Sequence, residues 1–439
     1  MSGKIKKIIR DFRTLGAEAA RLFLEAPLYD AGIRVYGLGV RVAAIRNNKA
    51  ALLSEGHRKV WEVLEGIRPS DRVIWFHAAS LGEFEQGRPL MEEVRRRFPH
   101  FRILLTFFSP SGYEVRKNYD GADWVCYLPF DTPANARRFV ERVRPEMAIF
   151  VKYEIWRNYL SRLWRMHVPT YLVSAVFRPE QRFFKKSGVW YREWLRWFTH
   201  IFVQDERSLS LLEGVGFRNV TVAGDTRFDR VKAIASQSCP VEELDIFCGG
   251  ERGVRCHGRI FMAGSSWPAD EDVYAPWLNL HPEVKAVVAP HEFDADRLGA
   301  HKSIFKGGAV LLSEAKRNHA LLHDAQVLII DCFGLLSSAY RYADVAYVGG
   351  GFGVGIHNVN EAAVYAVPVL FGPNHSKFIE AGGLKECGGG IAVADRASFA
   401  EAADAMFGDS GECRRRGESA GHYIASCCGA TRRIMDRLF

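Results

Sequence analysis

ADVAYVGGGFGVGIHNVNEAAVYAVPVLFGP, residues Ala343–Pro373, is the stretch that decides the fold. Val345–Val348 is a short apolar run typical of a buried strand, and Gly349–Gly355 is a loop in which five of seven residues are glycine. Glu361–Ala366 is expected to form the first turns of a helix, and Val367–Phe371 the next strand. A strand, a glycine-rich loop, a helix and a second strand make the βαβ unit of a parallel sheet.

The glycine-rich loop also indicates a ligand. Glycines let the backbone approach a bound molecule closely, and the N–H groups at the start of a helix attract an anion, most often a phosphate. The loop could simply turn tightly, but His357, Asn358 and Glu361 behind it favour a nucleotide or sugar-phosphate site. The sequence has no GxxxxGK[ST] and no fitting GxGxxG fingerprint, so neither a Walker loop nor a dinucleotide site is indicated.

Strands and helices of this kind alternate along most of the chain. The expected strands of a first domain are Val73–Ala79, Ile103–Phe107, Trp124–Leu128, Met147–Val151, Thr170–Val173 and His200–Val203. The expected strands of a second domain are Arg259–Ala263, Val284–Ala289, Gln326–Ile330, Val345–Val348 and Val367–Phe371. Between them, Ala233–His257 is interpreted as a linker or variable loop.

A chain of 439 residues is too long for one ordinary core, so two α/β domains are expected. We place a basic amphipathic segment at 1–50 and Rossmann-like domains at 51–220 and 221–439. Two Rossmann-like halves facing a central cleft make the GT-B fold. Glycosyltransferases share that fold with other enzymes, so the fold by itself does not decide the function.

The composition narrows the classes of protein further. With 48% hydrophobic residues the chain can bury ample apolar surface, which excludes global disorder. A net charge of +8 favours a polyanionic partner, namely nucleic acid, an anionic lipid surface or a phosphorylated substrate, although no nucleic-acid-binding motif occurs. Nine cysteines without a CxxC pair indicate neither a disulfide framework nor a zinc site, so reduced cytosolic thiols are expected.

The N-terminal region is basic and shows no secretory signal, and Lys4–Arg13 carries five cations. Leu28–Ile45 contains Asp30, Arg34 and Arg41, so we do not expect it to span a membrane. Such a helix either lies on an anionic membrane or packs on its own domain, and the basic segment before it favours the membrane. Its apolar residues at helical spacing are Ile33, Tyr36, Val40 and Ala44.

A second basic stretch is Phe177–Phe198, FRPEQRFFKKSGVWYREWLRWF. Trp190, Trp194 and Trp197 would lie on one helical face, which favours a position in the core. The basic residues that precede them could still bind lipid phosphates or the membrane interface.

Two expected strands of the first domain end in carboxylates. Ser80–Glu83 has the S-x-x-E pattern of a capping box, in which Glu83 accepts from the backbone N–H of the capping serine. At the end of a parallel strand the same carboxylate could instead take the proton from an attacking hydroxyl, with His77 orienting it or binding substrate. Lys152 and Glu154 follow a later strand, either as a simple ion pair or as part of the same cleft.

Small and polar residues follow strands of the second domain as well. Gly264–Trp267 is a small-residue turn that could hold a phosphate, and Pro290–Glu292 follows the next strand. In a doubly wound sheet the carboxyl ends of the strands converge on one crevice. Together with Gly349–Gly355, these turns predict a nucleotide-sugar site.

Nine segments in order resemble the 3-deoxy-D-manno-octulosonic acid (Kdo) transferase family. They are HAASLGEFEQGRPL, TFFSPSGYEV, YLPFDTPANARRFV, YEIWRN, FVQDE, VAGDTRFDRV, AGSSWPADE, YADVAYVGGGFGVGIHNVNEAA and FGPNHSKF. The resemblance covers roughly Leu28 to Val393. It implies an inverting GT-B transferase without metal or cofactor, which moves Kdo from CMP-Kdo to a lipid A precursor at the cytoplasmic face of the bacterial inner membrane.

By position, the resemblance implies that Glu83 is the catalytic base and that Glu154 is the retained second glutamate of another catalytic motif. It assigns to donor binding Ser265, Ser266, Pro290, His291, Gly350, Gly351, His357, Asn358 and Glu361. It assigns to the acceptor or the cleft His77, Ser80, Gly82, Lys152 and Arg178.

The sequence departs from the family pattern at several of these positions. Lys152 stands where the family has a glutamate, and Arg157 where it has a proline. The family's Arg-His-Pro-Glu-Arg segment is reduced to Pro290–Glu292, and its Asn-Pro-Leu-Glu-Pro segment is Asn358–Ala362 here. These differences concern the contacts to donor and acceptor and leave the reaction class unchanged.

The leading hypothesis is therefore a Kdo transferase whose partners are CMP-Kdo, a lipid A precursor and an anionic membrane surface, with no nucleic acid. One alternative is another GT-B transferase or epimerase that uses UDP-sugars. Another is a basic, non-catalytic protein that binds membranes or nucleic acid. A catalytic role requires Glu83 and Glu361 to face one cleft, whereas a binding module requires neither.

Overall fold

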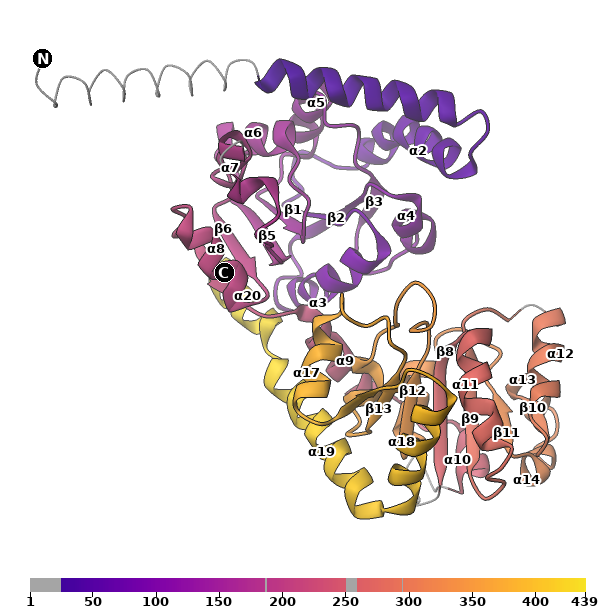
Figure 1. Cartoon of the computed structure of the whole chain (residues 1–439). Coiled ribbons are helices and arrows are strands. Elements are labelled where there is room, and N and C mark those ends of the chain that lie inside the picture. The colour runs from indigo at the N-terminus through magenta and orange to yellow at the C-terminus, as the bar shows by residue number, and fades with distance from the viewer. Residues whose placement is uncertain (1–24, 186–187, 250–258, 294) are drawn as a thin grey trace, which may run out of the picture. The chain divides into compact units, whose positions relative to one another are not determined.

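The structure is a computed structural model that describes residues 25–185, 188–249, 259–293 and 295–439 (Figure 1). It consists of two compact units. Unit 1 runs to Arg227 and also includes Gly429–Phe439, whereas unit 2 is Phe228–Cys428. The division lies inside helix α9 (Thr226–Gln237), a few residues after the expected boundary, and the last residues of the chain return to unit 1.

Unit 1 is built on a parallel sheet of seven strands in the order β3-β2-β1-β4-β5-β6-β7. Its strands are β1 (Val73–His77), β2 (Arg102–Phe107), β3 (Trp124–Tyr127), β4 (Met147–Val151), β5 (Thr170–Ala175), β6 (His200–Val203) and β7 (Val220–Val222). The helices that follow helix 25–43 are α2 (Asn48–Glu65), α3 (Leu81–Arg97), α4 (Pro110–Arg116), α5 (Pro133–Val143), α6 (Arg157–Arg165), α7 (Val189–Leu195), α8 (Glu206–Gly214) and α20 (Ala430–Leu438), with a 3-10 turn at Arg182–Phe184.

Unit 2 has a second parallel sheet of seven strands, in the order β10-β11-β9-β8-β12-β13-β14. Its strands are β8 (Ile260–Ser266), β9 (Lys285–Pro290), β10 (Ala309–Leu311), β11 (Val327–Ile329), β12 (Val345–Val348), β13 (Val369–Phe371) and β14 (Gly390–Ala392). Its helices are α10 (Glu242–Cys248), α11 (Pro268–Leu278), α12 (Ala295–Ile304), α13 (Leu312–Ala315), α14 (Leu321–Asp324), α15 (Leu336–Ala339), α16 (Asn360–Ala363), α17 (Ile379–Glu386), α18 (Arg396–Gly408) and α19 (Ser410–Cys427), with a 3-10 turn at Tyr340–Tyr342.

Each sheet is covered by helices on both faces, which explains why its strands are continuous apolar runs. In unit 1, alternate residues of β1 enter two different cores: Trp75 packs in one, and Ile74 and Phe76 in the other. Unit 2 repeats the arrangement, with Met262 in one core and Phe261 in the other. Two Rossmann-like units of this kind confirm the predicted α/β fold class.

Two expectations about local structure are wrong. The segment expected as a loop from Ala233 to His257 contains the end of α9 and all of α10, because Leu244 and Phe247 are buried in the core of unit 2. The helix expected at Glu361–Ala366 is only the single turn of α16.

Helix 25–43 carries apolar residues on two faces. Val40 packs against the core of unit 1, and the Tyr36 ring lies edge-on to Phe130 with 5.7 Å between ring centroids. A separate row, called here the apolar stripe, points away from the unit. It comprises Leu28, Val35, Leu38 and Val42 of the helix and Ile45 in the turn just after it, with exposed fractions of 72%, 70%, 61%, 61% and 80%.

Of the residues singled out in the sequence, Tyr36 and Val40 therefore attach the helix to its own unit, and the apolar stripe lies on another face. Among the described residues, no helix has the length and hydropathy needed to cross a bilayer. The basic segment Lys4–Arg13 lies outside the described residues.

Candidate functional site

In unit 1 the candidate site lies where the sheet order changes direction, between β1 and β4. Open α/β sheets bind their ligands at the carboxyl ends of the strands at such a switch point. His77 is the last residue of β1, and Lys152 follows the last residue of β4. The topology thus brings together the two segments that the sequence singled out.

Glu83 lies in the first turn of α3, just beyond the end of β1. Its Oε2 accepts a hydrogen bond from the Ala79 backbone N–H at 2.6 Å, and the Ser80 side chain makes no cap. The reciprocal capping box is therefore not formed. Burial, and next the negative charge of Glu154, raise the pKa of Glu83 from 4.5 to about 7, against the backbone amides and Lys152.

Glu154 is buried beside the end of β1 and takes part in a polar network. Its Oε2 accepts from Trp156 Nε1 at 2.6 Å and lies 3.1 Å from His77 Nε2. On the other side of the ring, His77 Nδ1 lies 2.8 Å from Thr106 Oγ1 and 3.1 Å from the Thr106 carbonyl oxygen. A carbonyl can only accept, so this contact places a proton on Nδ1, and Nε2 then accepts from Trp156 Nε1 at 3.1 Å, beside Glu154.

Lys152 holds the loop between these groups in an unusual conformation. Its φ of 67° is left-handed, while its N–H donates to the Val173 carbonyl at 2.8 Å. A side chain in that region costs about 1–3 kcal/mol and persists where the surroundings enforce it, often at functional sites. Burial raises the pKa of Tyr153, with Arg178 lowering it and Glu83 raising it, so these charges surround the same ring.

Gly82 completes the predicted set in unit 1. It is exposed in the first turn of α3, and a Cβ added there would meet only open space. Helix α3 therefore offers an unobstructed surface beside Glu83.

In unit 2 the corresponding switch point lies between β8 and β12. Asp270, in the first turn of α11, joins the two strand ends. Its Oδ2 accepts from the backbone N–H groups of Trp267 and Gly350, at 2.9 and 2.8 Å, and its Oδ1 accepts from the Tyr347 hydroxyl at 2.7 Å. The carboxylate thereby fixes the start of the glycine-rich loop against the turn after β8.

Three rings line this edge of unit 2. Trp267 stacks on His291 with 4.2 Å between centroids, and His291 lies 4.7 Å from His357. Trp267 Nε1 donates to His357 Nε2 at 3.3 Å. Burial, followed by the neighbouring His291, lowers the pKa of His357 and so favours its neutral ring. Flat rings of this kind suit the stacking of a nucleobase.

The other residues predicted to bind the donor substrate differ in which groups they leave available for a ligand. Asn358 Nδ2 and Ser337 Oγ both donate to the Glu361 carboxylate, at 3.0 and 2.5 Å. Ser265 is half-buried with a left-handed φ of 52°. Ser266 points inward, 2.8 Å from the Tyr274 hydroxyl, so its side chain supports the turn.

The glycines of Gly349–Gly355 allow the loop backbone to pack closely against the backbone at the ends of β8 and β13. A Cβ on Gly349 would lie 2.3 Å from the Ser265 carbonyl oxygen, and one on Gly351 would lie 2.6 Å from Gly372. Gly350 has a φ of 92°. The glycines thus allow β8, β12 and β13 to bring their ends close together, and the ligand surface results from that approach.

A family model described as 3-deoxy-D-manno-octulosonic-acid transferase (kdotransferase) matches residues 54–230. The 3-deoxy-D-manno-octulosonic acid transferase of Haemophilus influenzae is 25% identical over 382 residues, covering 84% of this chain and 87% of the relative. That of Chlamydia trachomatis is 25% identical over 351 residues, covering 76% and 79%. These matches confirm the predicted resemblance to the Kdo transferase family. The chain is accordingly a glycosyltransferase.

Among solved structures, a UDP-N-acetylglucosamine 2-epimerase matches with a TM-score of 0.55 at 14% identity, covering 84% of this chain and 95% of that one. At this identity the match shows the fold alone, and it agrees with a GT-B arrangement of two Rossmann-like units.

Sequence reasoning missed three residues that organise the sites. Trp156 and Asp270 hold the carboxylate network and the loop start, and Ser337 holds Glu361. Trp156 and Asp270 lie inside quoted motifs, YEIWRN and AGSSWPADE, so the motifs contained the signal. Ser337 stands between motifs and gave none.

Proposed function

We propose that the protein transfers Kdo from CMP-Kdo to a sugar hydroxyl of a lipid A precursor, with inversion at the anomeric carbon. The observation that carries the proposal is Glu83, a half-buried carboxylate at the β1/β4 switch point with its pKa raised to about 7, in a chain whose residues 54–230 match the Kdo transferase family model. Relatives named as 3-deoxy-D-manno-octulosonic acid transferases support the choice of donor sugar.

In the proposed step, Glu83 takes the proton from the acceptor hydroxyl while that oxygen bonds to the anomeric carbon of Kdo. The bond from this carbon to the CMP phosphate oxygen breaks, and CMP leaves with the electron pair. A base with a pKa near the working pH combines adequate basicity with a large deprotonated fraction. Glu154 supports this by raising the pKa of Glu83, and Trp156 Nε1 keeps Glu154 in place.

CMP is assigned to unit 2. The Gly350 amide already donates to Asp270, and the Gly355 amide already donates to the Gly350 carbonyl. Other groups of the glycine-rich loop would therefore bind the phosphate. The Trp267, His291 and His357 rings would face the base, and Glu361, already oriented by Asn358 and Ser337, would accept from the ribose hydroxyls. Oriented donors around the phosphate would stabilise the negative charge on departing CMP.

The acceptor is a lipid, and we propose peripheral association with the cytoplasmic face of the inner membrane. Support comes from the apolar stripe, which faces outward from helix 25–43 with Arg34 and Arg41 exposed on the same helix. Apolar side chains entering the interface next to cations that meet anionic headgroups are typical of helices that lie on a membrane.

The decisive experiment is an assay of the purified chain with CMP-Kdo and a tetra-acylated lipid A precursor, followed by mass spectrometry. The proposal expects a product heavier than the acceptor by added Kdo, together with free CMP. Thermal-shift measurements with CMP, UMP and UDP form the second arm. Protection by UMP or UDP without protection by CMP would replace this proposal with a UDP-sugar enzyme.

A further inference from the structure

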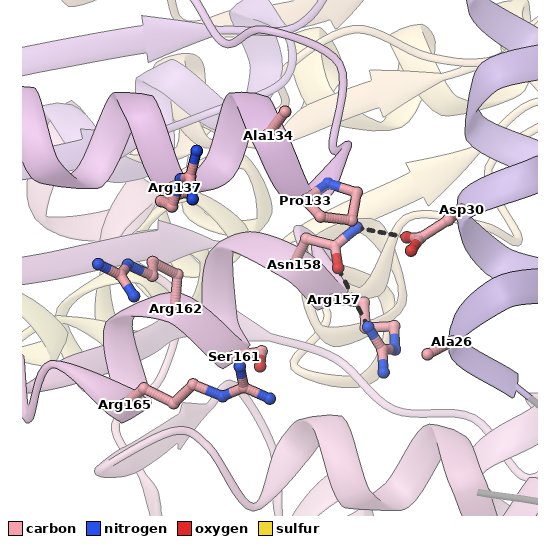
Figure 2. Close-up of a pocket in the computed structure, with 10 residues that line it drawn as sticks. All are labelled: Ala26, Asp30, Pro133, Ala134, Arg137, Arg157, Asn158, Ser161, Arg162 and Arg165. Carbon is pink, nitrogen blue, oxygen red and sulfur yellow. Dashed lines mark hydrogen bonds between the residues drawn. The ribbon is translucent and has the colours of Figure 1, made fainter. Parts of the chain in front are cut away.

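A cavity of about 500 Å³ lies entirely within unit 1, and none of the residues assigned to the reaction lines it. It is formed by the start of helix 25–43, the N-terminal end of α5 and one side of α6 (Figure 2). Its lining includes four arginines, and Asp30 is its one acidic residue. The arginines are Arg137, Arg157, Arg162 and Arg165.

The arginines are only partly neutralised. Arg157 Nε donates to Glu25 at 3.3 Å, and Arg162 Nη2 donates to Glu141 at 2.6 Å. The buried Nε of Arg162 has no hydrogen-bond partner, and Arg137 and Arg165 show none within the described part of the chain.

The one carboxylate that lines the cavity is also engaged. Asp30 accepts from Asn158 Nδ2 at 2.8 Å, as Figure 2 shows. Several guanidinium groups with free donors around one cavity make a site for a group with several anionic oxygens, above all a phosphate.

Helix 25–43 indicates where that phosphate comes from. Ala26 and Asp30 line the cavity, and Arg34 continues their row at spacings of four residues. This row runs along the flank of the helix, between the face packed on unit 1 and the apolar stripe. If the apolar stripe enters the acyl region, such a flank lies at the depth of the headgroups.

We propose that this four-arginine pocket binds the phosphate of a membrane lipid headgroup. The inference rests on the membrane association proposed above and is independent of which sugar the enzyme transfers. Fork-shaped guanidinium groups bind phosphate oxygens in pairs and fix the orientation of the bound group. The bound lipid would thus fix the orientation of unit 1 relative to the membrane, about the axis of helix 25–43. Non-specific attraction by scattered cations does not fix such an orientation.

The test uses the full-length chain and dihexanoyl phosphatidate, kept below its micelle concentration so that binding requires no membrane. The variant is Arg137→Gln/Arg165→Gln, because neither side chain has a partner within the described residues and the fold should tolerate their loss. The control is Arg207→Gln/Arg218→Gln, which removes the same charge from exposed positions elsewhere on unit 1. Unchanged melting temperatures establish that both variants are folded.

Calorimetric titration should show binding of dihexanoyl phosphatidate by the wild type and the control, and affinity at least about tenfold lower in the pocket variant, since charge-assisted contacts are lost. Equal affinity in wild type and pocket variant would overturn the proposal. Inorganic phosphate binding as tightly as the lipid would overturn the lipid source.

Vesicles containing phosphatidylglycerol separate this inference from the membrane proposal. Binding of the short-chain lipid without binding of vesicles would contradict peripheral association and leave a phosphate pocket. Binding of vesicles equally by wild type and pocket variant, with no binding of the short-chain lipid, would support general association and refute the pocket.

Discussion

Glu83 lies close enough to Glu154 that the negative charge of Glu154 helps to raise the pKa of Glu83, and this has a consequence for pH dependence. The pKa of Glu83 is raised to about 7, so the fold binds its proton more tightly than the unfolded chain does. The resulting stabilisation is present below the ordinary value of 4.5 and is lost as the pH rises through about 7. Catalysis runs the opposite way, because the base must be deprotonated.

We expect kcat/KM to rise with pH and level off above about 7, following the ionisation of Glu83. In Glu154→Gln the neighbouring negative charge is gone, so the rising limb should move to lower pH even though the maximal rate falls. Glu92→Gln, on the exposed side of α3, should leave the limb unchanged. If kcat/KM rises over the same pH range in Glu154→Gln as in the wild type, the electrostatic effect of Glu154 on Glu83 is refuted.

Glu83→Gln should lower kcat by about 10²–10⁴-fold, as expected for loss of a general base. The fold should survive, because the amide oxygen can still accept from the Ala79 N–H. Steady-state kinetics and the melting temperature are measured together. A folded Glu83→Gln protein with near-normal turnover would leave Glu83 only the task of ordering the start of α3.

In unit 2, Glu361→Ala should abolish the rise in melting temperature produced by CMP, since the carboxylate held by Asn358 and Ser337 is expected to bind the ribose. Glu386→Ala, exposed near the end of α17, is the matched control and should keep the CMP shift. An equal shift in both variants would remove Glu361 from the nucleotide site.

At the scale of elements, helix 25–43 gives a direct test of membrane binding. Val35→Gln/Leu38→Gln should weaken binding to anionic vesicles by about tenfold or more, because burying each apolar side chain contributes ~1.5–3 kcal/mol. High salt should weaken the remaining electrostatic part. The melting temperature should not change, since both side chains are exposed.

Leu280→Gln is the control for this experiment, because Leu280 is also exposed but belongs to unit 2. Vesicle binding that is the same in the stripe variant, in Leu280→Gln and in the wild type would mean that the apolar stripe does not meet lipid.

Most strands could be predicted from sequence, but three of the four edge strands, β7, β10 and β14, could not. Apolar runs such as Val73–His77 and Met147–Val151 are buried on both faces and stand out. β7, β10 and β14 have three residues each, too few for a periodic pattern, and gain their strand geometry from a neighbour already in the sheet. Helix α10 of the expected linker was missed because its seven residues are too few to show a helical repeat.

Site residues could be named from sequence because strand ends in parallel sheets are predictable, but their chemical state could not. The pKa of Glu83 depends on Glu154, which is adjacent only after β1 and β4 pair. Local sequence favoured a capping box, whereas in the structure Ser80 makes no side-chain cap and Glu83 accepts from the Ala79 N–H. The apolar stripe shows the same limit, since periodicity alone gave one apolar face for a helix that has two.

At the scale of the whole molecule, α20 belongs to unit 1 although all of unit 2 precedes it in the chain. Ile434, Met435 and Leu438 are buried in a core of unit 1, and Phe439 stacks on Phe98 with 4.1 Å between centroids. Deleting residues 429–439 should lower the free energy of unfolding of unit 1 by about 5 kcal/mol, from three buried side chains.

Urea unfolding followed by tryptophan fluorescence measures this loss, and the CMP shift, which reports unit 2, should persist. The control is Asp436→Ala, which removes a half-exposed ion pair and should change stability by about 0–1 kcal/mol. If the free energy of unfolding of unit 1 is the same in the truncated protein, α20 is not needed for the stability of unit 1.

The return of α20 also sets an order of events during synthesis. The ribosome makes almost all of unit 1 first, yet the core that receives Ile434 and Met435 stays open until Phe228–Cys428 has been translated. Throughout that interval the nascent chain displays an apolar surface suited to chaperones and to aggregation. Messages truncated within unit 2 should therefore yield insoluble polypeptides even though every strand of the first sheet has already been made.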